Sequence, residues 1–550
     1  MIERKGVRVW EWGGAETRTL SHTPALWHSL ARARTSGVAA AMVLVGIFLR
    51  IIPWLTNYPL HRDEALYGYW AQLIASGRDP LLLSPWVDKP PLVLYLLAAN
   101  IRAFGAHELA LRLPGLIASL LLVLVTFGFA RRAFGVRVAL CAAGLLTLSP
   151  FAILFAPTAF TDPWLALWLV AAAWAALARR PFRAGLLLGL AVASKQQGVL
   201  GVPLVFALLI VSKQQIANSK WQMAESGEQR ADRSLAKRSV VRDTLYAALG
   251  FALIFAPVTY WDSLRWVNRP SFWDRSVITY GQLALAPLVE WPQRAADWAT
   301  QIGYLFGLPA LSGLMLLIAA AVGVRAILQR PSDSLKRRVD VILALYTAGY
   351  LALHFAATFQ PWDRYLLPIL PWTCVLAARG LVLGLEGLGG RSGRQHRLRA
   401  GALLLLMPAL LYASWLGAAG RLPVGSDHGA YAGLDRVVAL LRQQPADAVI
   451  YDRWLGWHYD FYLFDAPQER RWWGSGWKLA DDAADTARSE PEREQWVVLP
   501  DWERSAVEDL NLPLASRGLA LVEVQRIYRP DNTRSFTLYR IAPLRAEVTP

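Results

Sequence analysis

Long apolar runs recur through the first 420 residues of this chain, and short polar segments separate them. Hydrophobic residues make up 55% of the chain and charged residues only 18%, whereas a soluble protein carries about 25% charged residues. Because about 20 apolar residues cross a bilayer as a helix, these runs predict a polytopic, all-α membrane protein. The 25 tryptophans agree with this prediction, since Trp concentrates where lipid meets water.

Basic residues cluster in alternate loops, which the positive-inside rule assigns to the cytoplasm. On this basis residues 1–36 form a cytoplasmic leader, and about eleven helices cross the cytoplasmic (inner) membrane. The first run, 37–55, lacks a small-residue cleavage site, so we interpret it as a retained span rather than a signal peptide. The short segment 91–104 is interpreted as a re-entrant or interfacial helix. The other spans are expected at about 113–130, 138–157, 163–178, two within 184–211, 243–258, 302–322, 339–358, 366–385 and 400–418, with a polar inner loop at 212–242.

Residues 421–550 differ in composition and are expected to form an extracytoplasmic, soluble α/β domain that follows the membrane domain at 37–420. Helical periodicity is found at 431–442, and 480–494 is interpreted as a polar loop. Strand patterns occur at 448–451, 495–499, 521–528 and 535–541.

Composition also excludes some classes of protein. The net charge is +16, but residues 421–550 hold 16 Lys and Arg against 20 Asp and Glu, so the excess lies in the short membrane loops. With no basic helix and no RNA-binding pattern, nucleic-acid binding is not expected. Cys141 and Cys374 lie in or beside apolar runs and indicate neither a disulfide framework nor a zinc site.

The predicted topology brings charged residues from distant segments to the outer ends of the spans. A layer of charge at a membrane boundary is costly unless the charges are paired or used. Charges that served only local structure would have no reason to share one side. The residues concerned are Asp63, Glu64, Asp88, Lys89, Asp162, Lys195, Asp262 and Arg364.

Asp63 and Glu64 allow two interpretations. They could cap a helix that begins near Ala65, where acidic residues favour the positive end of the helix dipole. Alternatively, one of them acts as a general base that takes a proton from an attacking acceptor. Their position among other charges in a loop at the membrane edge favours the second hypothesis.

The cationic residues also allow both a structural and a functional role. Lys89 precedes Pro90-Pro91, which would hold its ammonium at a fixed depth for a phosphate; alternatively, it snorkels to lipid headgroups. Lys195, in the turn of a predicted hairpin, has the same two interpretations. Arg364 could bind phosphate with its planar fork or pair with the neighbouring Asp363.

Two further carboxylates belong to the predicted layer. Asp162 precedes Pro163 and could be the N-cap of the next span, a use compatible with a role in the site. Asp262 could contact sugar hydroxyls, although a plain loop residue is the default interpretation.

These residues, in this order, resemble the GT-C glycosyltransferases of the ArnT and protein O-mannosyltransferase (PMT) type. The resemblance covers about residues 40–385 and leaves out the soluble tail. The motifs that carry it are Asp63-Glu64-Ala65-Leu66-Tyr67, Asp88-Lys89-Pro90-Pro91-Leu92, Leu111-Arg112-Leu113-Pro114, Arg131-Arg132-Ala133-Phe134-Gly135, Thr161-Asp162-Pro163, Ser194-Lys195-Gln196, the segment 257–261 and Arg364-Tyr365-Leu366-Leu367-Pro368.

The resemblance implies an integral-membrane enzyme that moves a sugar from a polyprenyl-phosphate donor to a lipid, glycan or protein acceptor. The reaction would be a single inverting displacement through an oxocarbenium-like transition state. The family's base maps to Asp63, with Glu64 beside it as a second catalytic candidate. The implied substrate- and phosphate-binding set is Lys89, Asp162, Lys195, Asp262, Arg364 and Tyr365.

A divalent metal is a further implication for some relatives, which use an acidic residue before the Lys-Pro and a histidine in the loop after the seventh span. Asp88 fits the first position, but residues 259–298 contain no histidine, so no cofactor is assigned. The Lys195-Gln196-Gln197 turn also departs from the Lys-Gly of relatives.

Two other functions remain as alternatives. A transporter or flippase for a lipid-linked sugar would place its polar residues near the bilayer midplane. A non-catalytic envelope assembly protein would have no need for the set of Asp63, Lys89 and Arg364.

Overall fold

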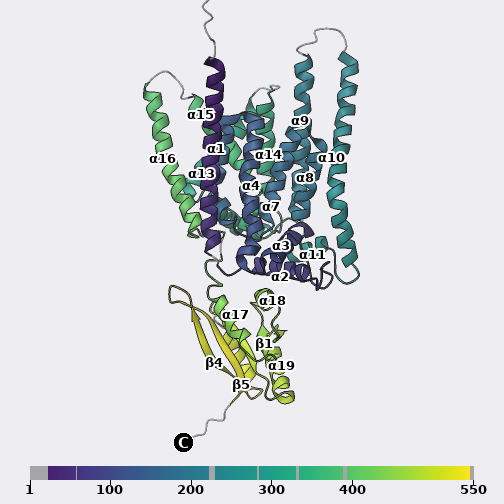
Figure 1. The fold of residues 1–550 in the computed structure, drawn as a ribbon, viewed down its shortest axis with the longest axis vertical. Coiled ribbons are helices and arrows are strands. Elements are labelled where there is room, and N and C mark those ends of the chain that lie inside the picture. Colours follow the sequence, from purple (N-terminus) through teal and green to yellow (C-terminus); the bar gives the residue numbers. More distant parts are fainter. Residues whose placement is uncertain are drawn as a thin grey trace, which may run out of the picture.

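The computed structural model describes residues 23–544 apart from 57, 222–228, 281–283, 330–333, 388–392, 426 and 504. Long helices form a bundle, and a smaller unit with a β-sheet lies beyond one end of it (Figure 1). Most of the predicted leader, 1–36, lies outside the described residues.

Five helical segments of the described chain are long and apolar enough to cross a membrane by length and composition, and shorter apolar helices accompany them. The protein is therefore a multi-pass membrane protein, whereas the count of eleven spans stays a prediction. The helices of the bundle are α1 (Thr23–Leu55), α4 (Glu108–Phe134), α5 (Val136–Leu148), α6 (Pro150–Leu154), α7 (Asp162–Leu177), α8 (Pro181–Ser194), α9 (Val202–Trp221), α10 (Gln229–Arg265), α13 (Pro309–Leu328), α14 (Leu335–Ala356), α15 (Leu370–Gly387) and α16 (Gly393–Ala418).

The predicted spans all coincide with helices, but three details differ. The helix expected at 138–157 is broken at Ser149, because Pro150 cannot continue the hydrogen bonds of α5. The expected inner loop 212–242 is largely helical, since α9 and α10 extend into it. The loop 259–298 holds α11 (Phe272–Tyr280), the 3-10 turn η2 (Leu288–Glu290) and the start of α12 (Trp291–Gly303).

Two short helices cross the end of the bundle that faces the sheet: α2 (Arg62–Ser76) and α3 (Pro91–Phe104). His61 caps α2 by accepting the amide of Asp63 at its Nδ1, while Glu64 accepts the amide of His61, which is a reciprocal capping box. Pro90 and Pro91 start α3, a position where the missing proline N–H costs nothing. The 14-residue α3 has the bounds expected for an interfacial helix.

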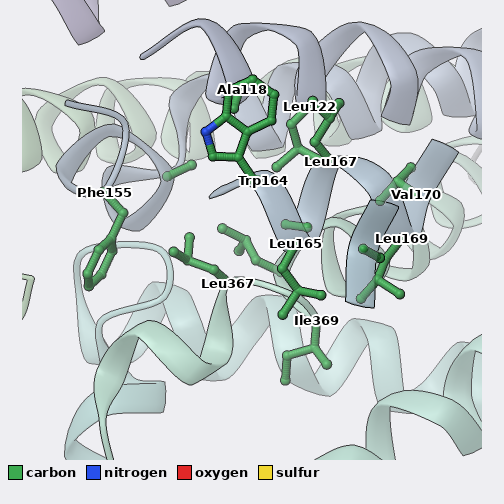
Figure 2. Packing of buried hydrophobic residues seen from close by; sticks show 14 of the residues in the cluster. Ala118, Leu122, Phe155, Trp164, Leu165, Leu167, Leu169, Val170, Leu367 and Ile369 are labelled. Atoms are coloured by element: carbon green, nitrogen blue, oxygen red, sulfur yellow. The ribbon is translucent and has the colours of Figure 1, made fainter. Parts of the chain in front are cut away.

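The core of the bundle forms around α7, which packs against α4, α8 and α9. Its side chains are almost all buried, including Leu165, Leu169 and Val170. Figure 2 shows side chains of α7 between Ala118 and Leu122 of α4 and the segment just before α15. Because α7 begins at Asp162, this packing fixes the height of that carboxylate in the bundle.

The C-terminal unit is built on a mixed five-stranded sheet of order β2-β1-β3-β5-β4. The strand β1 (Val449–Asp452) pairs in parallel with β2 (Glu469–Trp472) and β3 (Gln495–Pro500), and β5 (Arg534–Pro543) pairs antiparallel with β3 and β4 (Leu519–Tyr528). The helices of the unit are α17 (Leu434–Arg442), α18 (Gly456–Tyr462), α19 (Gly476–Ser489) and α20 (Ala506–Ala515).

The four predicted strands and the predicted helix of this unit are present, and β2 was not foreseen. The interpretation of 480–494 as a loop is wrong over most of its length, because α19 covers it up to Ser489. The acidic residues of that segment form the exposed face of an amphipathic helix, whose apolar face (Leu479, Ala480, Ala483) packs against the sheet.

The helix α18 joins the sheet unit to α2. Phe461 lies against Gly68, the hydroxyl of Tyr462 accepts the amide of Leu60 at 3.1 Å, and Nε2 of His458 is 2.9 Å from the carbonyl oxygen of Leu60. The C-terminal unit thus holds both polar groups of the peptide backbone that leads into Asp63.

A methyl group at Gly68 would lie 2.6 Å from the ring of Phe461. We expect Gly68→Ala to push α18 off α2 and to lower the free energy of unfolding by about 1–3 kcal/mol, the usual cost of overpacking. Thermal unfolding of the purified protein and tryptic cleavage at the basic residues near 421–442 measure the effect.

Gly313→Ala in α13 is the matched control, because nothing lies within 4 Å of the added carbon. It should leave stability unchanged or raise it slightly, since alanine favours the helix. Equal unfolding temperatures and cleavage rates for the two variants would contradict the close packing of α18 on α2.

Candidate active site

Asp63 lies in the first turn of α2 and forms an ion pair with Arg364. The Nη2 of Arg364 is 2.6 Å from Oδ2 of Asp63, and the carboxylate keeps 27% of its side chain exposed while the guanidinium is buried. The 3-10 turn η3 (Asp363–Leu366), just before α15, presents Arg364, which also stacks over the ring of Phe160 at 4.9 Å. The predicted base and one predicted phosphate ligand are therefore in direct contact.

Glu64, one residue further, has a different environment. It is buried, and Arg112 of α4 donates to both of its oxygens at 3.0 and 2.7 Å. Each oxygen also accepts a backbone amide, from Ala159 at 2.9 Å and from His61 at 3.0 Å. All four of these donors bind the carboxylate at once, so the geometry suits a residue that fixes the loop.

Lys89 projects from the turn before α3 into an acidic and aromatic environment. Its Nζ donates to Oδ2 of Asp88 at 2.6 Å and to the hydroxyl of Tyr280 at 2.7 Å, and it lies 5.8 Å from the ring centre of Tyr67. The backbone carbonyl of Asp88 accepts from Gln196, which ties this turn to the segment after Lys195.

Lys195 follows the last residue of α8 and pairs with Asp162 at the start of α7. The distance from Nζ to Oδ1 is 2.6 Å, and both side chains are buried. The ammonium lies 4.5 Å from the ring centre of Tyr365, a cation–π contact. The prediction that Asp162 is an N-cap is wrong, because Thr161 holds that position and Asp162 is the first residue of α7. Asp162 is instead the partner of a buried lysine.

These ion pairs act on one another. Burial alone would raise the pKa of Asp63, but the charge and hydrogen bond of Arg364, with smaller effects of His61 and Lys89, outweigh it and lower the pKa to about 2. Burial lowers the pKa of Lys195 to about 8; Asp162 opposes this change, while Arg364 and Lys89 add to it. The three cations from distant segments thus share one electrostatic environment at the end of the bundle.

Asp262 does not contact this group and instead joins α10 to α11. Its oxygens accept from the side chains of Ser271 and Trp266 and from the amide of Phe272. Its neighbour Arg265 donates to the carbonyls of Leu82 and Pro85, which fixes the chain leading to Lys89. Asp262 therefore has a local structural role in this geometry.

The residues around Asp88 do not fit a metal site. One oxygen is taken by the ammonium of Lys89, and the other has no hydrogen-bond partner within the described chain. No group of three or more His, Cys, Asp or Glu side chains suited to a metal ion occurs among the described residues. We therefore derive no step through a metal.

A cavity of about 580 Å³ lies beside Arg364. His61, Glu64 and Arg364 line it, together with residues of α12, the end of α16, residues 423–425 and Asp427. Neither Lys89 nor Lys195 lines it. Arg364 thus contacts both Asp63 and a chamber that the two lysines do not line.

Three residues of the site were not singled out as site residues from the sequence. Arg112 lies in one of the motifs quoted above. A charged residue near the start of a long apolar helix is unusual, and this feature could have identified Arg112 from the sequence. His61 lies two residues before Asp63, next to the acidic pair in the same loop. Tyr280 had no sequence signal, because only the path of α11 brings it to Lys89.

Residues 88–226 match the family model described as dolichyl-phosphate-mannose-protein mannosyltransferase. The fold is similar to that of ArnT from Cupriavidus metallidurans in the apo state, with a TM-score of 0.59 and 16% identity over 92% of this chain and 98% of that chain. The same protein bound to undecaprenyl phosphate gives a TM-score of 0.57 at 16% identity, again over 92% and 98%. The apo Archaeoglobus fulgidus oligosaccharyltransferase gives 0.54 at 14% identity, over 91% of this chain and 74% of that chain. No sequence among curated proteins matches the chain.

The bundle and the sheet beyond its end thus define a membrane protein with the GT-C fold. Within this fold, residues 88–226 are similar to the mannosyltransferase family model, and the matched segment begins at Asp88.

Removing the charge of Glu64 tests its structural role. Glu64→Gln leaves the buried Arg112 without its counter-charge, and we expect the free energy of unfolding to fall by about 3–5 kcal/mol, as when one partner of a buried pair is removed. Thermal unfolding in detergent measures this loss.

Arg137→Gln is the control, since it removes an ion pair with Glu386 whose side chains are 77% and 50% exposed. We expect little change there. If Glu64→Gln unfolded at the wild-type temperature but lost sugar transfer, its role would be chemical rather than structural.

Proposed function

We propose that this protein transfers a sugar from a polyprenyl-phosphate donor to an acceptor on the outer face of the cytoplasmic membrane. In this proposal the N-terminus is cytoplasmic, residues 37–420 form the catalytic membrane domain and residues 421–550 form an extracytoplasmic domain. The observation that carries the proposal is the proximity of three cations: Arg364 pairs with Asp63, Lys89 also acts on Asp63, and both act on Lys195. Three cations close to one partly exposed carboxylate suit a leaving phosphate next to a base.

The donor class is supported by the ligands bound in two similar structures. The Cupriavidus metallidurans protein was solved bound to undecaprenyl phosphate, and the Archaeoglobus fulgidus protein with a dolichol-phosphate. In this chain, Lys89 and Lys195 would hold the phosphate from two sides, with Tyr280 and Tyr365 as walls. Charge developing on the leaving phosphate would then meet groups that are already oriented.

Asp63 is assigned as the general base. While Arg364 is paired with it, a pKa of about 2 makes Asp63 a weak base. A donor phosphate would draw the guanidinium toward itself, and burial would then raise the basicity of the carboxylate. Phosphate binding would thus activate Asp63, and the acceptor oxygen would attack the anomeric carbon as its proton moves to Oδ2. The displacement would invert that carbon.

Glu64, Asp162 and Asp262 act on this reaction through other residues. Glu64 holds Arg112 and the loop, Asp162 orients Lys195, and Asp262 fixes the chain before Lys89. A flippase would move the donor without cleaving it, and a non-catalytic assembly protein would leave it bound or untouched.

Asp63→Asn keeps the shape of the side chain but removes the base. We expect transfer of label from radiolabelled polyprenyl-phosphate sugars, extracted from cells, to fall by about 10²–10⁴, the usual contribution of a general base. Membranes carrying the full chain are assayed for label in the acceptor fraction.

Asp465→Asn is the matched control, because Asp465 forms an exposed pair with Arg78 far from the lysines. It should transfer at the wild-type rate. Wild-type transfer by Asp63→Asn would overturn the assigned base, and donor translocation without cleavage would favour the flippase.

The pKa of Lys195 predicts a pH dependence. Lysine is charged below its pKa, so the KM for the donor should rise as the pH passes above about 8. Lys195→Arg should remove this limb, because arginine stays protonated. In the free enzyme Asp63 has a pKa of about 2, so kcat/KM for the donor should show no acid limb between pH 5 and 7.

Initial rates at several donor concentrations between pH 5 and 10 measure this dependence. The exposed Lys478 supplies the control variant Lys478→Arg, which should keep the wild-type profile. An unchanged alkaline limb in Lys195→Arg would exclude Lys195 as its source.

A further inference from the structure

We propose that the cavity beside the Asp63–Arg364 pair binds the acceptor, and that this acceptor presents an uncharged, hydroxyl-bearing saccharide rather than a phosphorylated one. The proposal rests on the proposed function and assigns the substrate class of its second substrate. It is carried by the position of the cavity, by the charges of its lining and by one fixed hydrogen-bond donor.

The position suits the attacking partner. The cavity shares Arg364 with the ion pair and includes His61, the residue that caps the helix of Asp63. Its volume of about 580 Å³ lies within the range of small-molecule sites. Since the two lysines lie outside it, the phosphate and the acceptor would approach the reacting carbon from different sides.

The charges of the lining disfavour an anion. Its two guanidiniums are committed: Arg112 binds Glu64, and Arg364 binds Asp63. The lining also holds Asp297, Asp363 and Asp427.

Within the described chain, the contacts of these three carboxylates are with amides rather than cations. Asp363 accepts the amides of Arg364 and Gly425, Asp427 accepts that of Gly429, and Asp297 accepts from Gln293. A phosphate in the cavity would meet their negative charge, and the two guanidiniums among the described lining residues are already paired. The hydroxyl groups of a sugar can instead donate to the carboxylates.

The hydrogen bond to Nδ1 of His61 determines which ring nitrogen can donate a hydrogen bond. Its Nδ1 accepts the amide of Asp63 at 3.1 Å, so the neutral ring carries its proton on Nε2. His61 lines the cavity, so this N–H can bind an acceptor oxygen beside the base.

The rest of the lining suits a saccharide joined to an apolar part. Tyr58, Phe160 and Trp362 supply aromatic faces, and Ile52, Leu154 and Ala418 supply an apolar wall. Gln301 also lines the cavity, and its Oε1 has no hydrogen-bond partner in the part of the chain that the structure describes. A sugar hydroxyl would satisfy that oxygen.

Protection of a cysteine placed in the cavity tests the inference. Thr300 is exposed and lines the chamber, so the full chain with Thr300→Cys is placed in nanodiscs of uncharged lipid without donor. Its alkylation by N-ethylmaleimide is followed by intact mass, with octyl maltoside or octyl maltoside 6′-phosphate added below their micelle concentrations. The parent chain, with half-buried Cys141 and buried Cys374, gives the background.

We expect octyl maltoside to slow the alkylation and its phosphate to bind about tenfold more weakly, a difference of about 1.4 kcal/mol. Asp297→Asn and Asp427→Asn, made separately, should each reduce this discrimination. Asp274→Asn, an exposed residue of α11 that does not line the cavity, should leave it unchanged.

Equal or better protection by the phosphorylated glycoside would overturn the assigned substrate class. No protection by either glycoside would overturn the cavity as the acceptor site. Both results leave the proposed function intact if sugar transfer still depends on Asp63, whereas loss of that dependence would reject the proposed function itself.

Discussion

The buried ion pair between Glu64 and Arg112 is the interaction on which the geometry of the site depends. It joins the first turn of α2 to α4, and through Arg112 it holds the carbonyls of Tyr58 and Pro59. The amide of Ala159 binds the same carboxylate, so the segment before Asp162 is fixed to the same point. Asp63 can remain partly exposed because the neighbouring Glu64 makes the contacts that hold the loop in place. Two adjacent acidic residues therefore have separate tasks, which their environments set.

The other charged residues of the site form ion pairs with one another. Lys89 faces Asp88, Lys195 faces Asp162 and Arg364 faces Asp63. Such pairing keeps buried charge tolerable in the absence of substrate. In the proposed reaction the donor phosphodiester, which carries one negative charge, replaces the carboxylates as partner of these cations, so binding the donor and freeing the base become one event. The carboxylates of Asp297, Asp363 and Asp427, which line the cavity beside Arg364, would then select the acceptor.

The sequence predicted more of the fold than of the contacts within the site. Apolar runs located the helices well, because a bilayer imposes their length and composition. The sorting of Asp63, Lys89, Asp162, Lys195 and Arg364 to one layer anticipated residues that the structure brings together. Sequence could not separate Glu64 from Asp63, since this difference arises from Arg112, 48 residues away. It also could not show that Asp262 serves α11, or that an acidic stretch near 480 is the outer face of a helix.

The hydrogen bonds between α18 and Leu60 connect the C-terminal unit to the start of α2. His458 and Tyr462 bind the carbonyl and the amide of one residue, and the next residue is the cap that orients Asp63. A tilt of the sheet unit would therefore reach the start of α2 as a strain on the two peptide units that flank Leu60. Under the proposed function, the C-terminal unit would act on the loop of Asp63 through this one residue.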